Sequence, residues 1–327
     1  MNARSGGTKR AVAMVALAML LAFNAIPASA ARNGTWVGPT SAREASDFWT
    51  VARMRAAKPL ELNRSAPRVR SGRKHGHRGK PRRIAPRVGA FGADFEQVAD
   101  PTAPEFRVHG AIFLSLGALG YGRCSGTAVS SHNRSVVITA GHCLNGGGRR
   151  GRWLGAKSVF VPAYRYGQRP FGVFPARWID TTKQWRATGS ENFDVGAMVV
   201  ERNEAGLKLT DAVGGAGIAW NLDPGQTFDV HGYPAEAPFD GETQRVCPGT
   251  PFLGHDANSF LFAGPLNLAV SCDLTGGASG GGWTIEGGVL NGVTDYGYFD
   301  EGSPAYGAYF GKEVARLFGR AAKVRLR

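Results

Sequence analysis

The sequence has 327 residues, of which 43% are hydrophobic and 20% are charged, with 47 glycines and 4 cysteines. This composition excludes disorder throughout the chain and collagen-like repetition, because it allows a sizeable apolar core. The formal net charge is +14, but residues 31–100 hold 15 Lys or Arg against 6 Asp or Glu, and residues 101–327 carry only +2. A function based on bulk basicity, such as binding nucleic acid or a membrane surface, is therefore restricted to the N-terminal third.

Residues 1–30 are predicted to be a signal peptide. Three basic residues precede an apolar run at residues 11–23, and Ala-Ser-Ala at 28–30 is a small-x-small pattern, so cleavage is expected after Ala30. The apolar run is shorter than the roughly 20 residues that cross a bilayer. We therefore expect a secreted, extracellular protein without membrane attachment after signal cleavage, in which disulfides are chemically allowed.

Residues 31–104 are predicted to be a prosegment and basic linker. Ser46 and Asp47 form a helix cap, Phe48, Val51 and Met54 follow at helical spacing, and Pro59 ends the pattern. The sequence therefore predicts one short amphipathic helix that docks on another part of the chain.

A strongly basic segment follows at residues 64–88, with ten Lys or Arg, two His and no acidic residue. Such a composition cannot bury enough apolar surface to order itself, so this part of the leader is predicted to be a largely disordered tether. The Lys-Pro-Arg-Arg sequence at 80–83 favours a protease-sensitive activation segment, as in a zymogen. The alternative is an anchor for an anionic cell-wall polymer or nucleic acid.

Residues 105–327 contain short β-type runs separated by Gly, Pro and Asn, which predict an all-β sandwich or barrel. Such runs occupy residues 111–114, 135–138 and 195–200. The exception is a short C-terminal helix predicted at residues 311–317, in which Val314 and Leu317 share one face.

A histidine follows one of these predicted strands. Thr-Ala-Gly-His-Cys at 139–143 comes directly after the apolar residues 136–138, and Cys124, 19 residues upstream, is the natural disulfide partner of Cys143. A lone histidine is more often structural than catalytic, but His142 at a strand end beside a disulfide is in position to act as a base.

A serine lies among glycines at residues 276–281. Glycine allows positive φ and close approach of a substrate, so the N–H groups of Gly277 and Ser279 can converge on an oxyanion. A Gly/Ser run alone also fits a flexible turn. Its context is more specific, because Cys272 anchors the segment, with Cys247 as its expected partner.

An acidic residue, Asp194, precedes the apolar run 195–200. A buried carboxylate is costly unless it is paired, and a histidine N–H is the partner that would orient a catalytic imidazole. Asp180 is the rival candidate, but no long apolar strand follows it, so Asp194 is preferred.

The chain order His142, Asp194, Ser279 resembles the chymotrypsin-like (trypsin-like) serine peptidases, which share the TAGHC and GxSGG motifs with a buried Asp between them. Subtilisin-type and α/β-hydrolase triads run in other orders. The resemblance covers about residues 105–320. The sequence looks most similar to the secreted bacterial branch that includes the glutamyl endopeptidases, because Val-Thr-Asp-Tyr-Gly at 293–297 resembles that branch's substrate-binding strand.

This resemblance implies two packed six-stranded antiparallel barrels with the site in the cleft between them. His142 would be the general base, Asp194 its orienting acid and Ser279 the nucleophile, with the N–H groups of Gly277 and Ser279 as the oxyanion hole. The substrate would be a protein or peptide, and neither metal nor cofactor is implied. The expected partners are that substrate and the chain's own prosegment, with no nucleic acid, and the protein is expected to be a monomer.

Two residues depart from the family pattern. Trypsin-type zymogens carry an Asp immediately before the nucleophile, where this chain has Ala278, so activation through an ion pair with a new N-terminus is not expected. Prosegment removal would instead uncover the cleft. Asp295 stands where relatives carry a small hydroxyl residue that supports the catalytic Asp, which predicts a shifted pH optimum.

The specificity residues are harder to assign. Asp273 lies six residues before Ser279, the spacing at which trypsin-like enzymes place the acid that binds Arg or Lys, but a structural role in the loop fits equally. Thr294 stands where glutamyl endopeptidases of this type present a His, which argues against a glutamate preference. Tyr296 and Gly297 complete the expected substrate-binding set.

A different class of function is a catalytically inactive secreted binding protein on the peptidase scaffold. The intact triad and oxyanion sequences argue against it. A nucleic-acid binder would rest only on residues 64–88, and fails if the mature protein begins after them.

Overall fold

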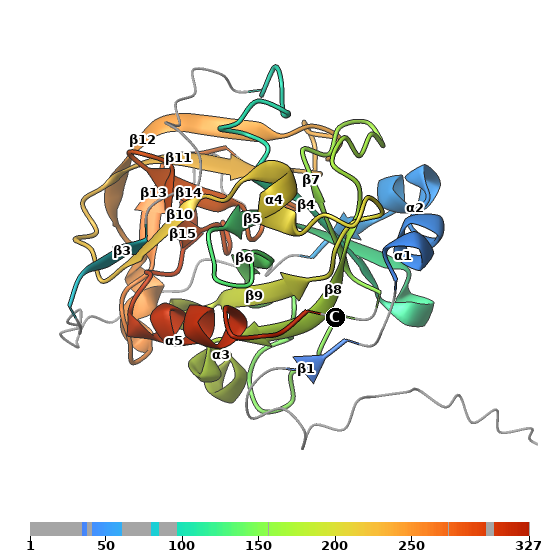
Figure 1. The fold of residues 1–327 in the computed structure, drawn as a ribbon. Helices are drawn as coiled ribbons and strands as arrows, with labels where there is room; N and C mark the ends of the chain where they lie inside the picture. Colours follow the sequence, from blue (N-terminus) through green and yellow to red (C-terminus); the bar gives the residue numbers. More distant parts are fainter. Residues whose placement is uncertain are drawn as a thin grey trace, which may run out of the picture.

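The computed structural model describes residues 35–37, 41–60, 80–84, 97–155, 157–273, 275–298 and 304–326. Strands dominate this part of the chain (Figure 1). The expected signal peptide and most of the basic tether lie outside the described residues. No described helix is long and apolar enough to cross a membrane.

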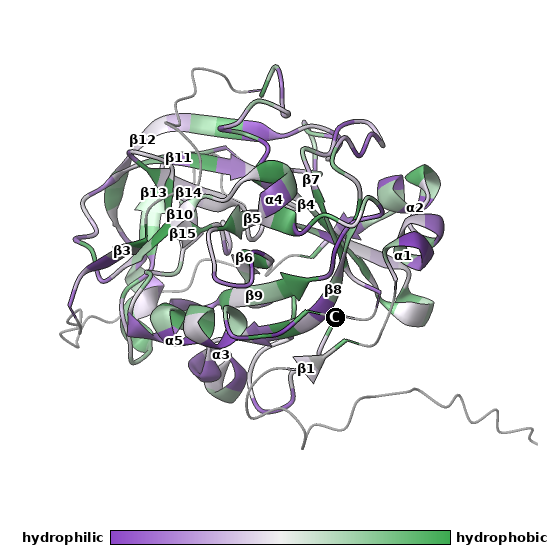
Figure 2. Ribbon diagram, in the orientation of Figure 1, coloured by the Kyte–Doolittle hydropathy of each residue, from purple (hydrophilic) through white to green (hydrophobic). Residues whose placement is uncertain are grey.

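The first barrel consists of six antiparallel strands. They are β4 (His109–Ser115), β5 (Tyr121–Val129), β6 (Val136–Ala140), β7 (Val159–Pro162), β8 (Phe174–Thr181) and β9 (Val195–Val200). The strands pair in the order β7-β4-β5-β6-β9-β8, and β8 pairs with β7 to close the ring. Every residue of β6, β7 and β9 is buried, and Figure 2 shows β9 mostly in the hydrophobic colours. The three predicted β-runs lie in β4, β6 and β9.

The second sheet has eight strands in the order β16-β13-β12-β11-β14-β15-β10-β3. They are β3 (Arg82–Ile84), β10 (Gly217–Trp220), β11 (Thr227–Gly232), β12 (Arg245–His255), β13 (Leu268–Val270), β14 (Gly282–Ile285), β15 (Val289–Val293) and β16 (Ala305–Gly307). The all-β class with two sheets is confirmed. Three details differ from the expected six-stranded antiparallel barrel: the sheet has eight strands in one path, β10 pairs with β15 in parallel, and β3 comes from the leader.

The leader contains more regular structure than the sequence predicts. Strand β1 (Thr35–Trp36) pairs with β8, and the expected single helix is two helices, α1 (Ala42–Phe48) and α2 (Val51–Arg55). Ser41, not Ser46, caps α1 through a capping box with Glu44, and Thr50 caps α2. The expectation of one helix was wrong because a second hydroxyl cap at Thr50 starts a new helix within the apolar pattern.

Part of the predicted disordered tether is a strand. The residues of β3 pair antiparallel with β10 and cover the edge of the second sheet. An uncovered edge would leave backbone N–H and C=O groups unpaired. Composition alone missed this pairing, because the strand is held by β10 and not by its own apolar content.

Short helices complete the fold: α3 (Lys183–Thr188), α4 (Leu209–Val213) and α5 (Lys312–Ala321), with 3-10 turns at Gly117–Leu119, Glu191–Phe193 and Ala257–Leu261. Helix α5 confirms the predicted C-terminal helix and extends it to Ala321. Its buried face, which includes Val314 and Leu317, packs against β8 and β9 of the first barrel (Figure 1).

Candidate active site

His142 is held at the end of β6 by the chain on both sides. Strand β6 ends at Ala140, shortly before His142. The disulfide between Cys124 and Cys143 ties the residue that follows His142 to β5. His142 is buried, and one of its ring nitrogens lies within 4.8 Å of both sulfurs. The strand end and the disulfide therefore restrict where the imidazole can point, and the predicted cysteine pairing is present.

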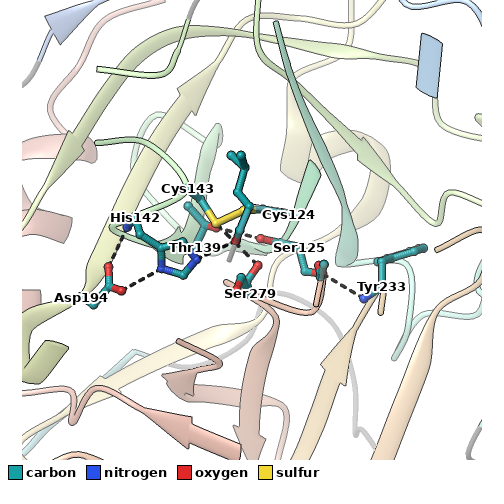
Figure 3. The surroundings of a disulfide bond; sticks show 10 residues. Cys124, Ser125, Thr139, His142, Cys143, Asp194, Tyr233 and Ser279 are labelled. Carbon is teal, nitrogen blue, oxygen red and sulfur yellow. Dashed lines mark hydrogen bonds and ion pairs between the residues drawn. A yellow bond between two sulfur atoms is a disulfide. The ribbon is translucent and has the colours of Figure 1, made fainter. Parts of the chain in front are cut away.

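Asp194 lies at the start of β9, is fully buried and contacts His142 twice. Its Oδ1 accepts the backbone N–H of His142 at 2.7 Å, and its Oδ2 lies 2.8 Å from His142 Nδ1 (Figure 3). A Cβ at Gly141 would come within 2.7 Å of Asp194 Oδ1, so only glycine allows this approach. The two contacts fix the ring orientation and favour a proton on Nδ1.

Ser279 reaches the same place from the second sheet. In Figure 3 the ring of His142 lies between Asp194 and Ser279. The Ser279 carbonyl accepts the N–H of Ser125 at 2.7 Å and lies 3.7 Å from the Cys143 sulfur. The structure thus brings together the three residues predicted as a triad, with two from the first barrel and one from the loop before β14.

Ser125 is a site residue that the sequence reasoning did not identify. Its hydroxyl donates to the Gly277 carbonyl at 2.8 Å and accepts the N–H of Tyr233 at 2.9 Å, so it joins the serine loop to the second sheet (Figure 3). Thr139 in turn donates to the Ser125 carbonyl at 2.8 Å. The available signal was position, because Ser125 directly follows a disulfide cysteine.

Gly277 occupies a position where a side chain does not fit. Its φ is +94°, and a Cβ would lie 2.7 Å from the carbonyl of Tyr233. The preceding carbonyl, that of Gly276, accepts the N–H of Ala235. In a trans peptide the N–H points opposite to the C=O, so the Gly277 N–H points away from Ala235. The hydrogen bond to Ala235 thus fixes the orientation of the peptide group before Gly277, whose N–H is predicted to be part of an oxyanion hole.

Asp295 is fully buried, and Asp194 is close enough to act on its charge. Its Oδ2 accepts the N–H of Ala308 at 2.5 Å, while its Oδ1 has no hydrogen-bond partner among the described residues. Burial, followed by the charge of Asp194, raises the pKa of Asp295 well above its usual value. The Asp295 carboxyl therefore holds its proton to higher pH than an ordinary aspartate does.

Three of the expected substrate-binding residues follow β15. Thr294 is buried, and its hydroxyl accepts the indole N–H of Trp283 at 2.9 Å. Tyr296 is also buried and donates its hydroxyl to Asp256 at 2.5 Å, whereas Gly297 is exposed. The polar groups of Thr294 and Tyr296 are thus engaged within the protein, and their role in substrate binding stays a prediction.

The predicted specificity acid, Asp273, is exposed. Its carboxylate lies 3.7 Å from the sulfur of Cys247, beside the predicted disulfide between Cys247 and Cys272, which is present. A contact with the surface disulfide fits the structural alternative that the sequence left open. Preference for Arg or Lys stays a prediction.

Two clusters of described residues have donor spacing that suits a metal ion: Cys124 and Cys143 with His142, and Cys247 and Cys272 with Asp273. All four cysteines are in disulfides. Metal ligation by cysteine uses the thiolate, which a disulfide sulfur does not offer. Neither cluster therefore has a full donor set.

Two solved structures resemble this chain in both fold and sequence. The thermostable serine protease AL20 from an extremophilic microorganism is 32% identical, and the match covers 68% of this chain and 100% of that one, with a TM-score of 0.61. The protease Anisep from Arthrobacter nicotinovorans is 33% identical over 72% of this chain and 100% of its own, with a TM-score of 0.60. With its two-sheet fold and this likeness, the chain belongs to the chymotrypsin-like serine proteases.

A Glu endopeptidase has the same fold at 18% identity, over 72% of this chain and 99% of its own, with a TM-score of 0.56. At this identity the likeness shows a shared fold. No protein-family model and no curated protein sequence matches the chain.

Proposed function

We propose that the protein is a secreted serine endopeptidase that hydrolyses peptide bonds through His142, Asp194 and Ser279. The observation that carries the proposal is the buried pair of Asp194 and His142, with Nδ1 and Oδ2 at 2.8 Å, beside a serine in a glycine-rich loop. Such a pair orients the ring so that Nε2 is the nitrogen that can act on a hydroxyl, which is the chemistry of an activated serine.

The proposed reaction follows from the roles of these atoms. Ser279 Oγ attacks the carbonyl carbon of the substrate, and its proton moves to His142 Nε2. The N–H groups of Gly277 and Ser279 stabilise the oxyanion. His142 then gives the proton to the leaving amine, and water, activated by the same nitrogen, hydrolyses the acyl-enzyme. Asp194 keeps the ring oriented and stabilises the imidazolium.

The finer parts of the proposal concern processing and specificity. We propose a signal peptide at 1–30, a prosegment and linker at 31–104, and a monomeric peptidase domain at 105–327. Two disulfides and membership in a family with bacterial proteases support an extracellular location. Cleavage after Arg or Lys is proposed from Asp273, which lies six residues before Ser279.

The test is labelling of the folded, processed protein with a fluorophosphonate, which reacts only with an activated serine. We expect labelling of the wild type and its loss in Ser279→Ala, followed by a positional peptide library to read the preferred residue. A variant at a hydroxyl outside the site, Ser131→Ala, should label as the wild type does. If the processed wild type does not label, the enzyme assignment fails in favour of an inactive binding protein on this scaffold.

A further inference from the structure

The leader is built into the first barrel by two buried side chains. Trp49 and Met54 are both fully buried and pack in one cluster with Phe113 and Val159 of the barrel strands. The Trp49 indole N–H donates to the carbonyl of Lys157 at 2.7 Å. Burial removes these large apolar side chains from water, so helices α1 and α2 are attached to the barrel by hydrophobic packing.

From α2 the chain runs along the edge of β5. Strand β2 (Lys58–Pro59) pairs in parallel with Gly122 and Arg123 of β5. The next backbone N–H, that of Leu60, donates to the Arg123 carbonyl at 3.1 Å. The leader is thus an added strand on β5. It pairs with the residues directly before Cys124, whose disulfide with Cys143 restricts the position of His142.

This added strand ends on the candidate base. The carbonyl oxygen of Leu60 lies 3.1 Å from His142 Nε2, while Nδ1 of the same ring faces Asp194 Oδ2 at 2.8 Å. Both ring nitrogens thus face oxygen atoms of the protein. The Leu60 carbonyl lies at Nε2, where the hydroxyl of Ser279 would have to donate its proton, so the two groups compete for the same ring nitrogen.

The Leu60 side chain adds a steric contact. A Cβ on Gly122 would lie 2.9 Å from the Leu60 side chain, and Leu60 packs on the core of the first barrel. The charged contact between Arg55 and the nearly buried Glu242, at 3.4 Å, further fixes α2. Leu60 is therefore held in place by its backbone hydrogen bond and by the packing of its side chain. Together these contacts keep its carbonyl beside His142.

We infer that the edge of β5 beside His142 is a binding site for an extended peptide, and that residues 41–60 of the leader occupy it as an inhibitor. This inference rests on the proposed function. Farther along the leader, Lys80 has its own contact with the protein, because its carbonyl accepts a hydrogen bond from the Asn221 side chain at 3.0 Å. Cleavage between residues 61 and 79 would therefore free the end of the inhibitory segment and let it dissociate.

Tethering explains how cleavage would switch the enzyme on. A segment joined by a short linker has an effective concentration of about millimolar. Once nicked, the same segment competes at the concentration of the protein itself. Dilution to about micromolar then lowers its occupancy, while the intact chain is insensitive to dilution.

The experiment uses the full chain with a recognition sequence for a sequence-specific protease at residues 66–72. We expect the intact protein to react slowly with a fluorophosphonate, and the nicked protein to react about tenfold faster or more after dilution. A synthetic peptide of residues 41–60 should suppress this reaction again, and the same peptide with Trp49→Ala should not.

Two intact-chain variants test the contact while leaving Trp49 and Met54 in place. Leu60→Pro removes the N–H that donates to Arg123 and the packed leucine side chain, so it should raise labelling by at least about threefold to tenfold, the effect of losing one hydrogen bond. Arg43→Ala, an exposed change on α1, should label as the wild type does.

The outcomes separate the inference from the function on which it rests. If intact and nicked proteins label equally fast and the peptide has no effect, the inhibitory role is wrong and the protease function stands. If neither form labels at any dilution, the serine is not activated and both proposals are overturned.

Discussion

Asp295 and Asp194 are both fully buried, but their carboxyl oxygens have different partners. Asp194 accepts two hydrogen bonds from His142, whereas Asp295 accepts one, from the Ala308 N–H. Two adjacent carboxylates cannot both ionise cheaply in a buried site. Burial and the neighbouring Asp194 therefore raise the pKa of Asp295, so this carboxyl stays protonated to higher pH than an exposed aspartate would.

The raised pKa of Asp295 makes stability depend on pH. The pKa of Asp295 in the folded protein exceeds its unfolded value of about 3.9. Its contribution to the free energy of unfolding is therefore fully present below about pH 3.9 and is lost as pH rises through the folded pKa. Asp295→Asn cannot titrate, so its free energy of unfolding relative to wild type should rise with pH above about 4, by up to about 1.4 kcal/mol per pH unit. Urea unfolding between pH 4 and 9 measures this, with exposed Asp47→Asn as the control; parallel curves would contradict it.

The same residue should shape the pH dependence of catalysis. As pH rises, ionisation of Asp295 places a second charge beside Asp194 and disturbs the cluster that orients His142. Asp295→Ser should therefore keep its activity to higher pH than the wild type. Profiles of kcat/KM against pH test this, and an unchanged profile would refute it.

At the scale of elements, α5 is attached to the first barrel by a buried ion pair as well as by apolar packing. Asp180 in β8 is fully buried and pairs with Arg186 and with Arg320 of α5, whose Nε lies 2.7 Å from Asp180 Oδ2. Asp180, the rival acid of the sequence analysis, thus binds two arginines, while Asp194 contacts His142. Its role is to hold a helix on the barrel.

Removing one partner of this pair should destabilise the protein. Arg320→Ala deletes charge-assisted hydrogen bonds to Asp180 and one to the Thr181 carbonyl, with an expected cost of about 1.5–3 kcal/mol. Arg316→Ala, on an exposed position of the same helix, should cost less than about 0.5 kcal/mol. Chemical denaturation of both variants compares them; equal stabilities would show that apolar packing alone attaches α5.

At the scale of the whole molecule, two histidines lie where the first barrel meets the second sheet. His109 of β4 and His231 of β11 are both buried, and their rings stack with centroids 3.8 Å apart. Burial lowers the pKa of His231 to about 3, and burial together with His231 lowers that of His109 well below its usual value. The contact between the first barrel and the second sheet therefore contains two imidazoles that resist protonation.

Acid should weaken this interface. Between pH 6.5 and about 3 the unfolded chain binds protons that folded His231 does not, so stability is full above pH 6.5 and falls as pH decreases. His231→Phe keeps an aromatic ring without a titratable group, and its stability should fall less over this range. Thermal unfolding across pH 4–7 measures the difference, with exposed His132→Gln as the control. Identical acid dependence in His231→Phe and wild type would exclude the histidine pair as the cause.

Local patterns in the sequence determined much of the fold. Apolar runs predicted β4, β6 and β9, helical spacing predicted α5, and the cysteine spacings predicted both disulfides. His142 and Asp194 were identifiable because each lies next to one end of a buried strand. Burying a polar group there costs free energy unless a partner binds it. These features depend on neighbours within a few residues, which is the range that periodicity and turn chemistry report.

The tertiary structure alone decided which distant segments meet. Leu60 reaches His142, 82 residues away, and β3 pairs with β10, although the leader composition predicted a disordered tether. Likewise, the exposure of Asp273 and the burial of Asp295 follow from how the loops pack. Contacts of this kind depend on the shape of a surface assembled from many segments, and no short stretch of sequence encodes that shape.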